Sequence, residues 1–256
     1  MTLTRRVVQR LLRAKGYEVS RLDRPGKDPI VDIGHLLKGQ APRVILDVGA
    51  NEGQTTEQFI SAFPSAMVHS FEPFEPSFRK LSAIFAASGQ VRAVQCALGE
   101  SEAEMILYVN SASVTNSLLP NSPEARLFQP PGMACEITSV PMRVSTVDAY
   151  CEAEGVSFID VLKTDTQGYD LHVLRGAGQM MRDGNVGVVL TEVLFAPLYS
   201  GQSYFHEVYE HLWGSGFRLV SLYGLALNEA GYASWCDALF VHPQSVSRRR
   251  REIGIA

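Results

Sequence analysis

Short apolar runs alternate with longer stretches of helical periodicity along most of this chain. The strand-like runs lie at 43–48, 66–71, 91–96, 159–163 and 186–191. Between them, apolar residues recur three or four positions apart, which predicts helices near 55–63, 77–87, 147–154, 170–181 and 204–214. This alternation predicts an α/β fold with a doubly wound, mostly parallel sheet and helices on both faces.

The last two strand-like runs, at 217–222 and 237–242, have a different connection. Only about a dozen residues join them, with Gly224 and Gly231 among them and no helical period. Because a parallel crossover is usually longer and helical, we expect a hairpin here. The seventh and last strand is therefore predicted to run antiparallel.

Residues 100–147 interrupt the alternation. Strand-like runs at 105–109 and 137–144 flank a stretch rich in Ser, Asn and Pro at 110–132. A structureless loop of this length is unusual in a compact domain unless it covers a binding site. We expect a β-insertion before the fourth strand that carries a mobile lid.

Composition fits one enzyme-sized domain. Hydrophobic residues make up 46% of the chain and can supply a sizeable core, and 20% charged residues argue against disorder. The net charge of −4 gives no general attraction to nucleic acid. We expect an N-terminal helical extension (1–42), a main domain (43–242) that includes the 100–147 insertion, and a basic C-terminal tail (243–256).

Basic residues gather at both ends of the chain. Several lie on an amphipathic helix expected at about 3–15, and residues 248–251 are four arginines. Such runs are usually solvated, but they can also hold an acidic partner or a membrane surface. The oligomeric state stays open, and a homo-oligomer is among the alternatives.

The cysteines, the apolar segments and the first residues bear on cellular location. No two of the four cysteines have the CysXxxXxxCys spacing of zinc or redox sites, so we expect reduced thiols. No apolar segment reaches the length of a membrane span, and the first twenty residues do not resemble a secretory signal. These features predict a cytoplasmic protein.

The most informative stretch is 44–56, ValIleLeuAspValGlyAlaAsnGluGlyGlnThrThr. An apolar strand ends there in a glycine turn, which leads into a helix. The residues that mark it are Asp47, Gly49, Asn51, Gly53 and Thr55. Such a turn brings backbone close to a nucleotide-like ligand. Glu72 follows 19 residues after Gly53, at the end of the second strand, where a carboxylate can bind ribose hydroxyls.

The ligand of this turn can be a dinucleotide or S-adenosylmethionine. The dinucleotide fingerprint requires glycine at positions that here hold Asn51 and Gln54. S-adenosylmethionine has no pyrophosphate and needs less bare backbone, and Asn tolerates a left-handed turn position. A turn without a ligand is the remaining alternative, but the glycines and Glu72 occur together. The pattern favours S-adenosylmethionine.

Several segments together resemble the FkbM family of methyltransferases. They are AspValGlyAlaAsnGluGly at 47–53, PheGluProPheGluProSerPhe at 71–78, AlaLeuGly at 97–99, SerThrValAspAlaTyr at 145–150, LysThrAspThrGlnGlyTyrAsp at 163–170, ValLeuArgGlyAla at 173–177 and ThrGlu at 191–192. The match covers about residues 43–242. GlnGlyTyrAsp stands where GluGlyXaaGlu is frequent, and LeuPheAlaProLeuTyr follows Glu192, so no substrate carries over.

The resemblance implies a fold, an activity and a cofactor site. The fold is the Rossmann-like sheet of class I methyltransferases, with seven strands and the last one antiparallel. The activity is methyl transfer from S-adenosylmethionine to a hydroxyl oxygen, often on a sugar or a polyketide. The residues expected to hold the cofactor are Asp47, Gly49, Asn51, Gly53, Thr55, Glu72, Pro73, Ala97 and Leu98.

The acceptor side should lie beyond the carboxyl ends of the central strands. Asp165 and Glu192 stand at or just past two such ends and are the candidate catalytic residues, and a reversed last strand brings Asp237 beside Glu192. One carboxylate can act as general base, or the three can hold Mg²⁺. Without a tight set of adjacent carboxylates, we favour the metal-independent route. The candidate substrate-binding residues are Gln167, Tyr199, Asn116 and His206.

Two functions of different classes follow. The first is an O-methyltransferase that acts on a hydroxyl of a sugar, a glycan, or a glycosylated or polyketide small molecule, with no nucleic-acid partner. The second is a non-catalytic S-adenosylmethionine-binding module that recruits partners through its basic N-terminal helix and C-terminal tail. The four acidic residues Asp47, Glu72, Asp165 and Glu192 favour the enzyme.

Overall fold

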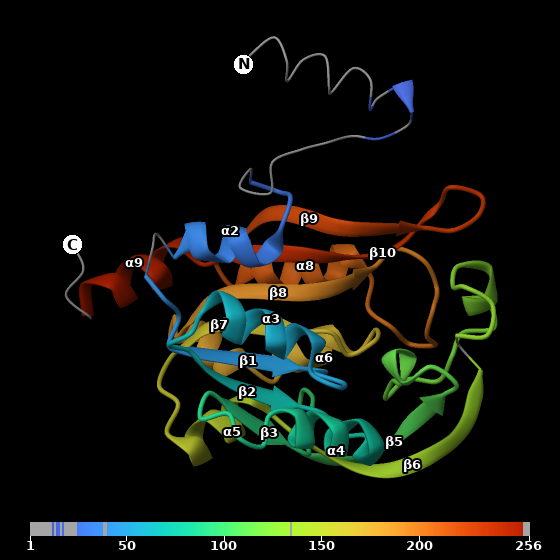
Figure 1. Cartoon of the computed structure of the whole chain (residues 1–256), viewed down its shortest axis with the longest axis horizontal. Helices are drawn as coiled ribbons and strands as arrows, with labels where there is room; N and C mark the ends of the chain where they lie inside the picture. Colours follow the sequence, from blue (N-terminus) through green and yellow to red (C-terminus); the bar gives the residue numbers. More distant parts are fainter. Residues whose placement is uncertain are drawn as a thin grey trace.

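A seven-stranded sheet, in the order β3-β2-β1-β7-β8-β10-β9, forms the centre of the computed structural model (Figure 1). Neighbouring strands from β3 to β8 are parallel, and β10 is antiparallel to both β8 and β9. The expected sheet with its reversed strand is thus confirmed. The strands are β1 (Val44–Val48), β2 (Met67–Phe71), β3 (Val91–Val94), β7 (Ile159–Thr164), β8 (Val186–Leu194), β9 (Arg218–Leu227) and β10 (Ala233–Val241).

The structure describes residues 12, 14–15, 17, 25–37, 40–133 and 135–252. Almost all of the helix expected at about 3–15 therefore lies outside the described residues. Within the expected N-terminal extension, α2 (Pro29–Leu36) packs on the main domain, because Ile33 is fully buried in the same cluster as Ile45 of β1. Part of the extension thus belongs to the core.

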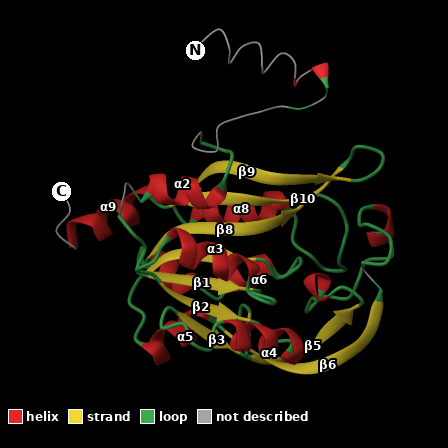
Figure 2. Cartoon of the chain, in the orientation of Figure 1, coloured by secondary structure: helices red, strands yellow, loops and turns green. Residues whose placement is uncertain are grey.

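Helices cover both faces of the sheet (Figure 2). They are α2, α3 (Gln54–Ala62), α4 (Glu75–Ile84), α5 (Val147–Glu154), α6 (Asp170–Arg175), α7 (Gly178–Arg182), α8 (Phe205–Gly214) and α9 (Pro243–Glu252). Side chains of a strand point alternately to the two faces. Accordingly, Ile45 packs in one buried cluster with Phe59 of α3, and Leu46 packs in the other with Leu171 of α6 and Leu212 of α8.

The sequence predicted one helix over 170–181, but the chain forms α6 and α7 with a break at Gly176 and Ala177. The break lies where two backbones touch. A Cβ atom on Gly176 would come within 1.9 Å of the carbonyl oxygen of Gly99. The carbonyl of Gly176 also accepts a hydrogen bond from the backbone N–H of Asp148. A continuous helical side-chain surface does not fit at this contact.

The β-insertion is confirmed as a second, three-stranded sheet in the order β4-β6-β5. Its strands are β4 (Ala97–Leu98), β5 (Ala103–Asn110) and β6 (Glu136–Ser145), and the segment between β5 and β6 contains the short helices η1 (Ser113–Thr115) and η2 (Ala125–Leu127). That segment lies against the main domain, with a bridge between Asn121 and Tyr199 and a hydrogen bond from Ser122 N to Leu198 O. Its mobility stays a prediction.

The C-terminal basic segment is helical over the residues of α9. Arg248 donates to the carbonyls of Asp183 and Gly184 behind α7, and Arg249 lies 3.8 Å from Asp160 and over the ring of Phe158. Two of the arginines expected in a basic tail are therefore engaged with the main domain. Within the described part of the chain, no helix combines the length and the apolar character needed to cross a membrane.

Candidate functional site

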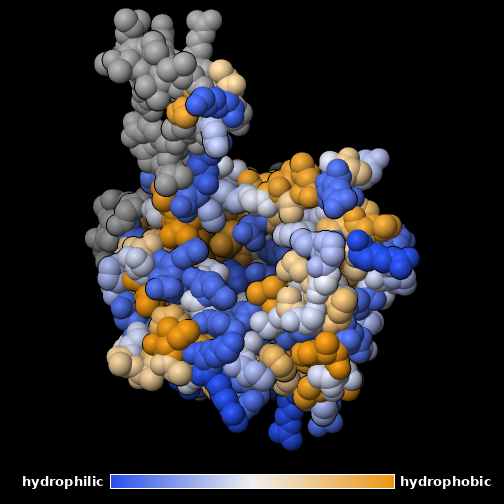
Figure 3. Space-filling view, turned by 45° about the vertical axis from the view of Figure 1, so that its right-hand side comes forward, coloured by the Kyte–Doolittle hydropathy of each residue, from blue (hydrophilic) through white to orange (hydrophobic). Residues whose placement is uncertain are grey.

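A pocket opens at the carboxyl ends of the parallel strands. The arrowheads of β1, β2 and β8 in Figure 1 point towards this side, and the insertion lies beyond them. The cavity has a volume of about 330 Å³, within the range of small-molecule sites. Figure 3 brings this side of the molecule forward, and its surface is hollowed near the middle. The walls come from the turn after β1, the end of β2, β4, the insertion and the segment after β7.

The turn after β1 has the left-handed backbone that its sequence suggested. Gly49 has φ 80° and Asn51 has φ 48°. A Cβ atom on Gly49 would lie 1.9 Å from the carbonyl oxygen of Asp165, so only glycine lets the two loops meet. Gly53, at φ 99°, packs instead against Leu81 and does not line the pocket. Gly49 and Asn51 do line it.

Glu72 closes this turn from the end of β2. Its carboxylate accepts hydrogen bonds from Asn51 N at 2.9 Å and Phe74 N at 2.8 Å. Each oxygen keeps a second lone pair, and the residue lines the pocket. A buried acceptor beside an open glycine turn fits the ribose hydroxyls of the expected cofactor. Burial raises the pKa of Glu72 to about 7, although the two backbone hydrogen bonds lower it.

The raised pKa of Glu72 predicts pH-dependent cofactor binding. Below about pH 7 the carboxyl is protonated, and above it the ionised group accepts hydroxyl hydrogen bonds more strongly. We expect the affinity for S-adenosylmethionine to rise as the pH passes through about 7, and Glu72→Gln to remove this rise. Calorimetric titration at a series of pH values measures both. Glu57→Gln, at an exposed position on α3, should keep the wild-type dependence. The same rise in Glu72→Gln would contradict the assignment.

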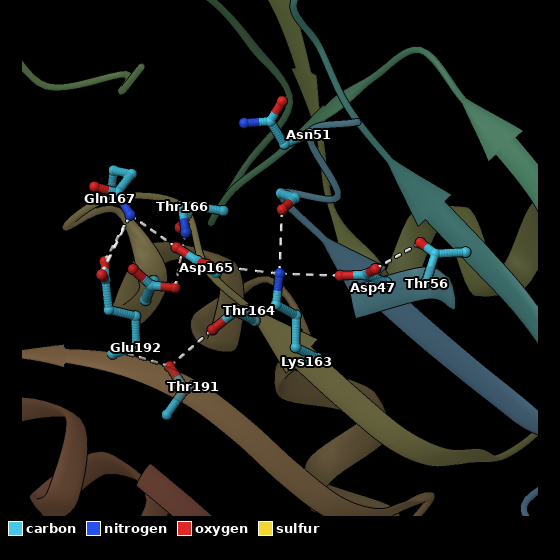
Figure 4. Close-up of polar contacts among 12 residues, drawn as sticks. Asp47, Asn51, Thr56, Lys163, Thr164, Asp165, Thr166, Gln167, Thr191 and Glu192 are labelled. Atoms are coloured by element: carbon cyan, nitrogen blue, oxygen red, sulfur yellow. Dashed lines mark hydrogen bonds and ion pairs between the residues drawn. The ribbon is translucent and has the colours of Figure 1, made fainter. Parts of the chain in front are cut away.

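Asp47 does not line the pocket but forms an ion pair with Lys163, which does. The Asp47 carboxylate is fully buried, accepts from Thr56 Oγ1 at 2.7 Å and lies 3.0 Å from Lys163 Nζ. Lys163 Nζ also donates to Gly49 O at 3.1 Å and lies 3.8 Å from Asp165 (Figure 4). Burial lowers the pKa of Lys163, but Asp47, Asp165 and Asp237 together outweigh this and hold the pKa above its usual value. The lysine is charged and links the glycine turn to the Asp165 loop.

Sequence reasoning missed Lys163. A single lysine inside the apolar run IleAspValLeuLys was the available signal, because a buried lysine needs an acidic partner. The partner is directly opposite, since Asp47 and Lys163 face each other in the β1–β7 register. That pairing required the strand order and its register, which the single strands do not specify.

On the acceptor side, one amide group gathers the candidate carboxylates. Gln167 Nε2 donates to Asp165 Oδ1 at 2.8 Å and lies 3.2 Å from each carboxylate oxygen of Glu192 (Figure 4). Asp165 is 39% exposed and lines the pocket, whereas Glu192 is buried behind Gln167. Burial and then the charge of Asp165 raise the pKa of Glu192 well above its usual value.

Asp237 lies where the reversed strand was expected to place it. It faces Glu192 in the β10–β8 register. Burial and then Asp165 raise the pKa of Asp237 to about 6, while Lys163 opposes the shift. Among the described residues, no group of three or more His, Cys, Asp or Glu side chains has an arrangement that could hold a metal ion.

The insertion supplies the wall that faces the glycine turn. Asn51 Nδ2 lies 3.4 Å from Ser113 Oγ, and Ser117 Oγ donates to Gln167 O at 2.7 Å. Asn116 lines the pocket, but its Oδ1 accepts from Asn110 N at 2.8 Å and so shapes the insertion. The segment expected as a lid therefore contacts both the cofactor turn and the acceptor side.

The expected site residues fall into three groups: those that line the pocket, those behind its walls, and His206, which lies outside it. Those that line the pocket are Gly49, Asn51, Thr55, Glu72, Pro73, Ala97, Leu98, Asn116, Asp165 and Gln167. Those behind its walls are Asp47, Gly53, Glu192, Tyr199 and Asp237. Tyr199 is 2% exposed and donates to Gln167 Oε1 at 2.7 Å. His206 is exposed, stacks on Tyr204 and does not line the pocket, because it points outward from the start of α8.

The chain is similar to several known proteins. The 2-O-methyltransferase NoeI of Sinorhizobium fredii (strain NBRC 101917 / NGR234) is 25% identical over 173 residues, which are 65% of this chain and 69% of that protein. Among solved structures, the METTL16 methyltransferase domain is 12% identical, with a TM-score of 0.48 over 93% of this chain and 79% of that one. Fibrillarin of Aeropyrum pernix, solved with S-adenosyl-L-methionine, is 13% identical, with a TM-score of 0.44 over 79% of this chain and 67% of that one.

The family assignment rests on a sequence match. The model described as the methyltransferase FkbM domain matches residues 47–219, which include the glycine turn, Glu72, Asp165 and Glu192. This is more than half of the chain. The chain therefore belongs to the FkbM family of S-adenosylmethionine-dependent methyltransferases.

Proposed function

We propose that the protein transfers a methyl group to a hydroxyl oxygen of a sugar, a glycan, or a glycosylated or polyketide small molecule. The observation that carries this proposal is Asp165, a carboxylate on the wall of the cofactor pocket that shares one amide donor with Glu192. A pair of carboxylates suits a hydroxyl acceptor, whose proton must leave as the oxygen is methylated. The similarity to a 2-O-methyltransferase supports the same chemistry.

The cofactor half of the pocket would hold S-adenosylmethionine with residues that follow β1 and β2 and with residues of β4. Glu72 offers its lone pairs to the ribose, the open turn at Gly49 and Asn51 offers backbone, and Ala97 and Leu98 give an apolar wall. When bound, the cofactor supplies a methyl group that its sulfonium makes electrophilic. Lys163 holds the turn and the Asp165 loop together, so that both halves of the pocket keep their spacing.

The acceptor half has to activate a weak nucleophile, because a neutral hydroxyl attacks poorly. Asp165 Oδ1 is held by Gln167, and the exposed side of this carboxylate faces the pocket, where it can accept the hydroxyl proton. Glu192 is the second carboxylate and takes no direct part in the pocket wall. Burial and the charge of Asp165 raise the pKa of Glu192, so its protonated form is favoured beside Asp165.

Asp165→Asn tests the proposed base. The amide keeps the shape of the side chain but cannot take a proton, so we expect turnover to fall about 10²-fold or more with unchanged cofactor affinity. Steady-state kinetics and calorimetry separate the two quantities. Asp183→Asn is the matched control, since Asp183 is exposed behind α7 at the opposite end of the sheet. Wild-type turnover in Asp165→Asn would remove Asp165 from the chemistry.

A further inference from the structure

Gln167 has an unusual backbone conformation on the acceptor side. It has φ 56°, a left-handed conformation that is uncommon for a residue other than glycine. Asn51 is the other such residue in the described part of the chain, and both line the pocket. A conformation of this kind persists only where surrounding contacts hold it, and it is often found at functional sites.

The contacts that hold Gln167 fix which way its amide points. Ser117 Oγ from the insertion donates to its backbone carbonyl at 2.7 Å. Tyr199 OH, buried behind β8, donates to its side-chain oxygen at 2.7 Å. Because the oxygen takes the tyrosine proton, the amide nitrogen must face the opposite way, towards Asp165 and Glu192.

We propose that Gln167 is a positioning residue, and this proposal rests on the methyl transfer proposed above. Its amide nitrogen bridges Asp165 and Glu192 and holds the two carboxylates in place for the proton transfer. It does not itself contact the acceptor. The distances of 2.8 Å to Asp165 and 3.2 Å to Glu192 put the nitrogen between them. The Gln167 amide has two N–H donors, and the two carboxylates that accept from them would otherwise repel each other.

The electrostatic surroundings explain why such a bridge matters. The charged and titratable groups near Glu192 and Asp165 are Lys163 on β7, Asp170 at the start of α6, Asp237 on β10 and Tyr199 after β8. Lys163 is the cation of this set and is already paired with Asp47. Donors from a neutral amide therefore stabilise the ionised forms of the carboxylates where negative charge is in excess.

Gln167→Glu is the decisive variant, because it keeps the size of the side chain and replaces the donor by a third carboxylate. We expect turnover to fall by about 10²-fold and the acid limb of the pH–rate profile to move up by about one unit. The sign follows from like charge, because a third carboxylate disfavours ionisation of its neighbours, so that ionised base appears only at higher pH. Gln244→Glu, exposed on α9 at the opposite end of the sheet, should change neither quantity.

A purely structural role would give a different result. Loss of turnover in Gln167→Glu with an unmoved acid limb would overturn the proposal, as would wild-type kinetics. Tyr199→Phe adds a second test, because it removes the proton that orients the amide. It should shift the acid limb in the same direction by a smaller amount, and an unchanged profile would count against the bridge.

A readout without turnover keeps this inference separate from the proposed function. In ¹⁵N-labelled wild-type protein, the side-chain amide signal of Gln167, assigned by its absence in Gln167→Glu, should shift with pH as the neighbouring Glu192 titrates. A signal that is independent of pH over the range in which the protein stays folded overturns the bridge. If the signal titrates but no hydroxyl acceptor is methylated, the proposed function fails and the bridge stands.

Discussion

Replacing Gly49 by Ala should abolish binding of S-adenosylmethionine. The position has φ 80°, and a Cβ atom there would lie 1.9 Å from the carbonyl oxygen of Asp165. The added atom meets backbone, which cannot move aside like the end of a flexible side chain. The turn after β1 and the loop after β7 must therefore separate, and both line the pocket. Calorimetric titration should show no binding.

Gly89→Ala is the matched control for this substitution. Gly89 is exposed, and a Cβ atom there would have no neighbour within 4 Å. Cofactor affinity and melting temperature should both stay at the wild-type level. Circular dichroism on Gly49→Ala distinguishes a folded protein with a distorted pocket from an unfolded one. A folded Gly49→Ala variant that binds the cofactor as tightly as wild type would contradict the placement of the pocket.

Replacing Lys163 by Met should destabilise the fold by about 3–5 kcal/mol, the usual cost of removing one partner from a buried ion pair. Lys163 is only 7% exposed, its partner Asp47 is fully buried, and the pair lies between β1 and β7 at the centre of the sheet. Met fills a similar volume, so the loss reports the charge of Asp47 that stays behind. Urea-induced unfolding measures it.

Lys80→Met gives the comparison at the surface. Lys80 pairs with Glu52 at 2.6 Å, but the two side chains are 60% and 35% exposed. Its loss should cost less than about 1 kcal/mol, because water and salt screen such pairs. The double variant Asp47→Asn/Lys163→Met should recover part of the stability lost in Lys163→Met. Equal effects of Lys163→Met and Lys80→Met would mean that the central pair contributes little.

The sheet was predictable because its signals are local. Each strand is an apolar run of typical length, and the short link with Gly224 and Gly231 predicts the final hairpin, which is observed between β9 and β10. The prediction that Asp237 lies beside Glu192 is confirmed for the same reason, since it follows from the reversed strand. Asn51 was also foreseeable, because asparagine tolerates the left-handed conformation that it adopts.

The arrangement of side chains in the site was not predictable from these signals. The Asp47–Lys163 pair needs the register of two strands more than a hundred residues apart, since their Cα partners are fixed only in the assembled sheet. Gln167 adopts a left-handed conformation that its residue type does not suggest. Its contacts come from the insertion and from the segment after β8, so they exist only in the folded chain. The break at Gly176 likewise reflects a contact with Gly99 that periodicity cannot reveal.

Transfer of labelled methyl from S-adenosylmethionine to hydroxyl acceptors tests the central claim most directly. The panel should contain monosaccharides, glycans, and glycosylated and polyketide small molecules, each paired with an analogue that lacks the hydroxyl or carries it already methylated. The account predicts label in at least one hydroxyl acceptor, with an equal amount of S-adenosylhomocysteine and none with its paired analogue. Tight cofactor binding without S-adenosylhomocysteine from any acceptor would contradict it and would leave a non-catalytic binding module.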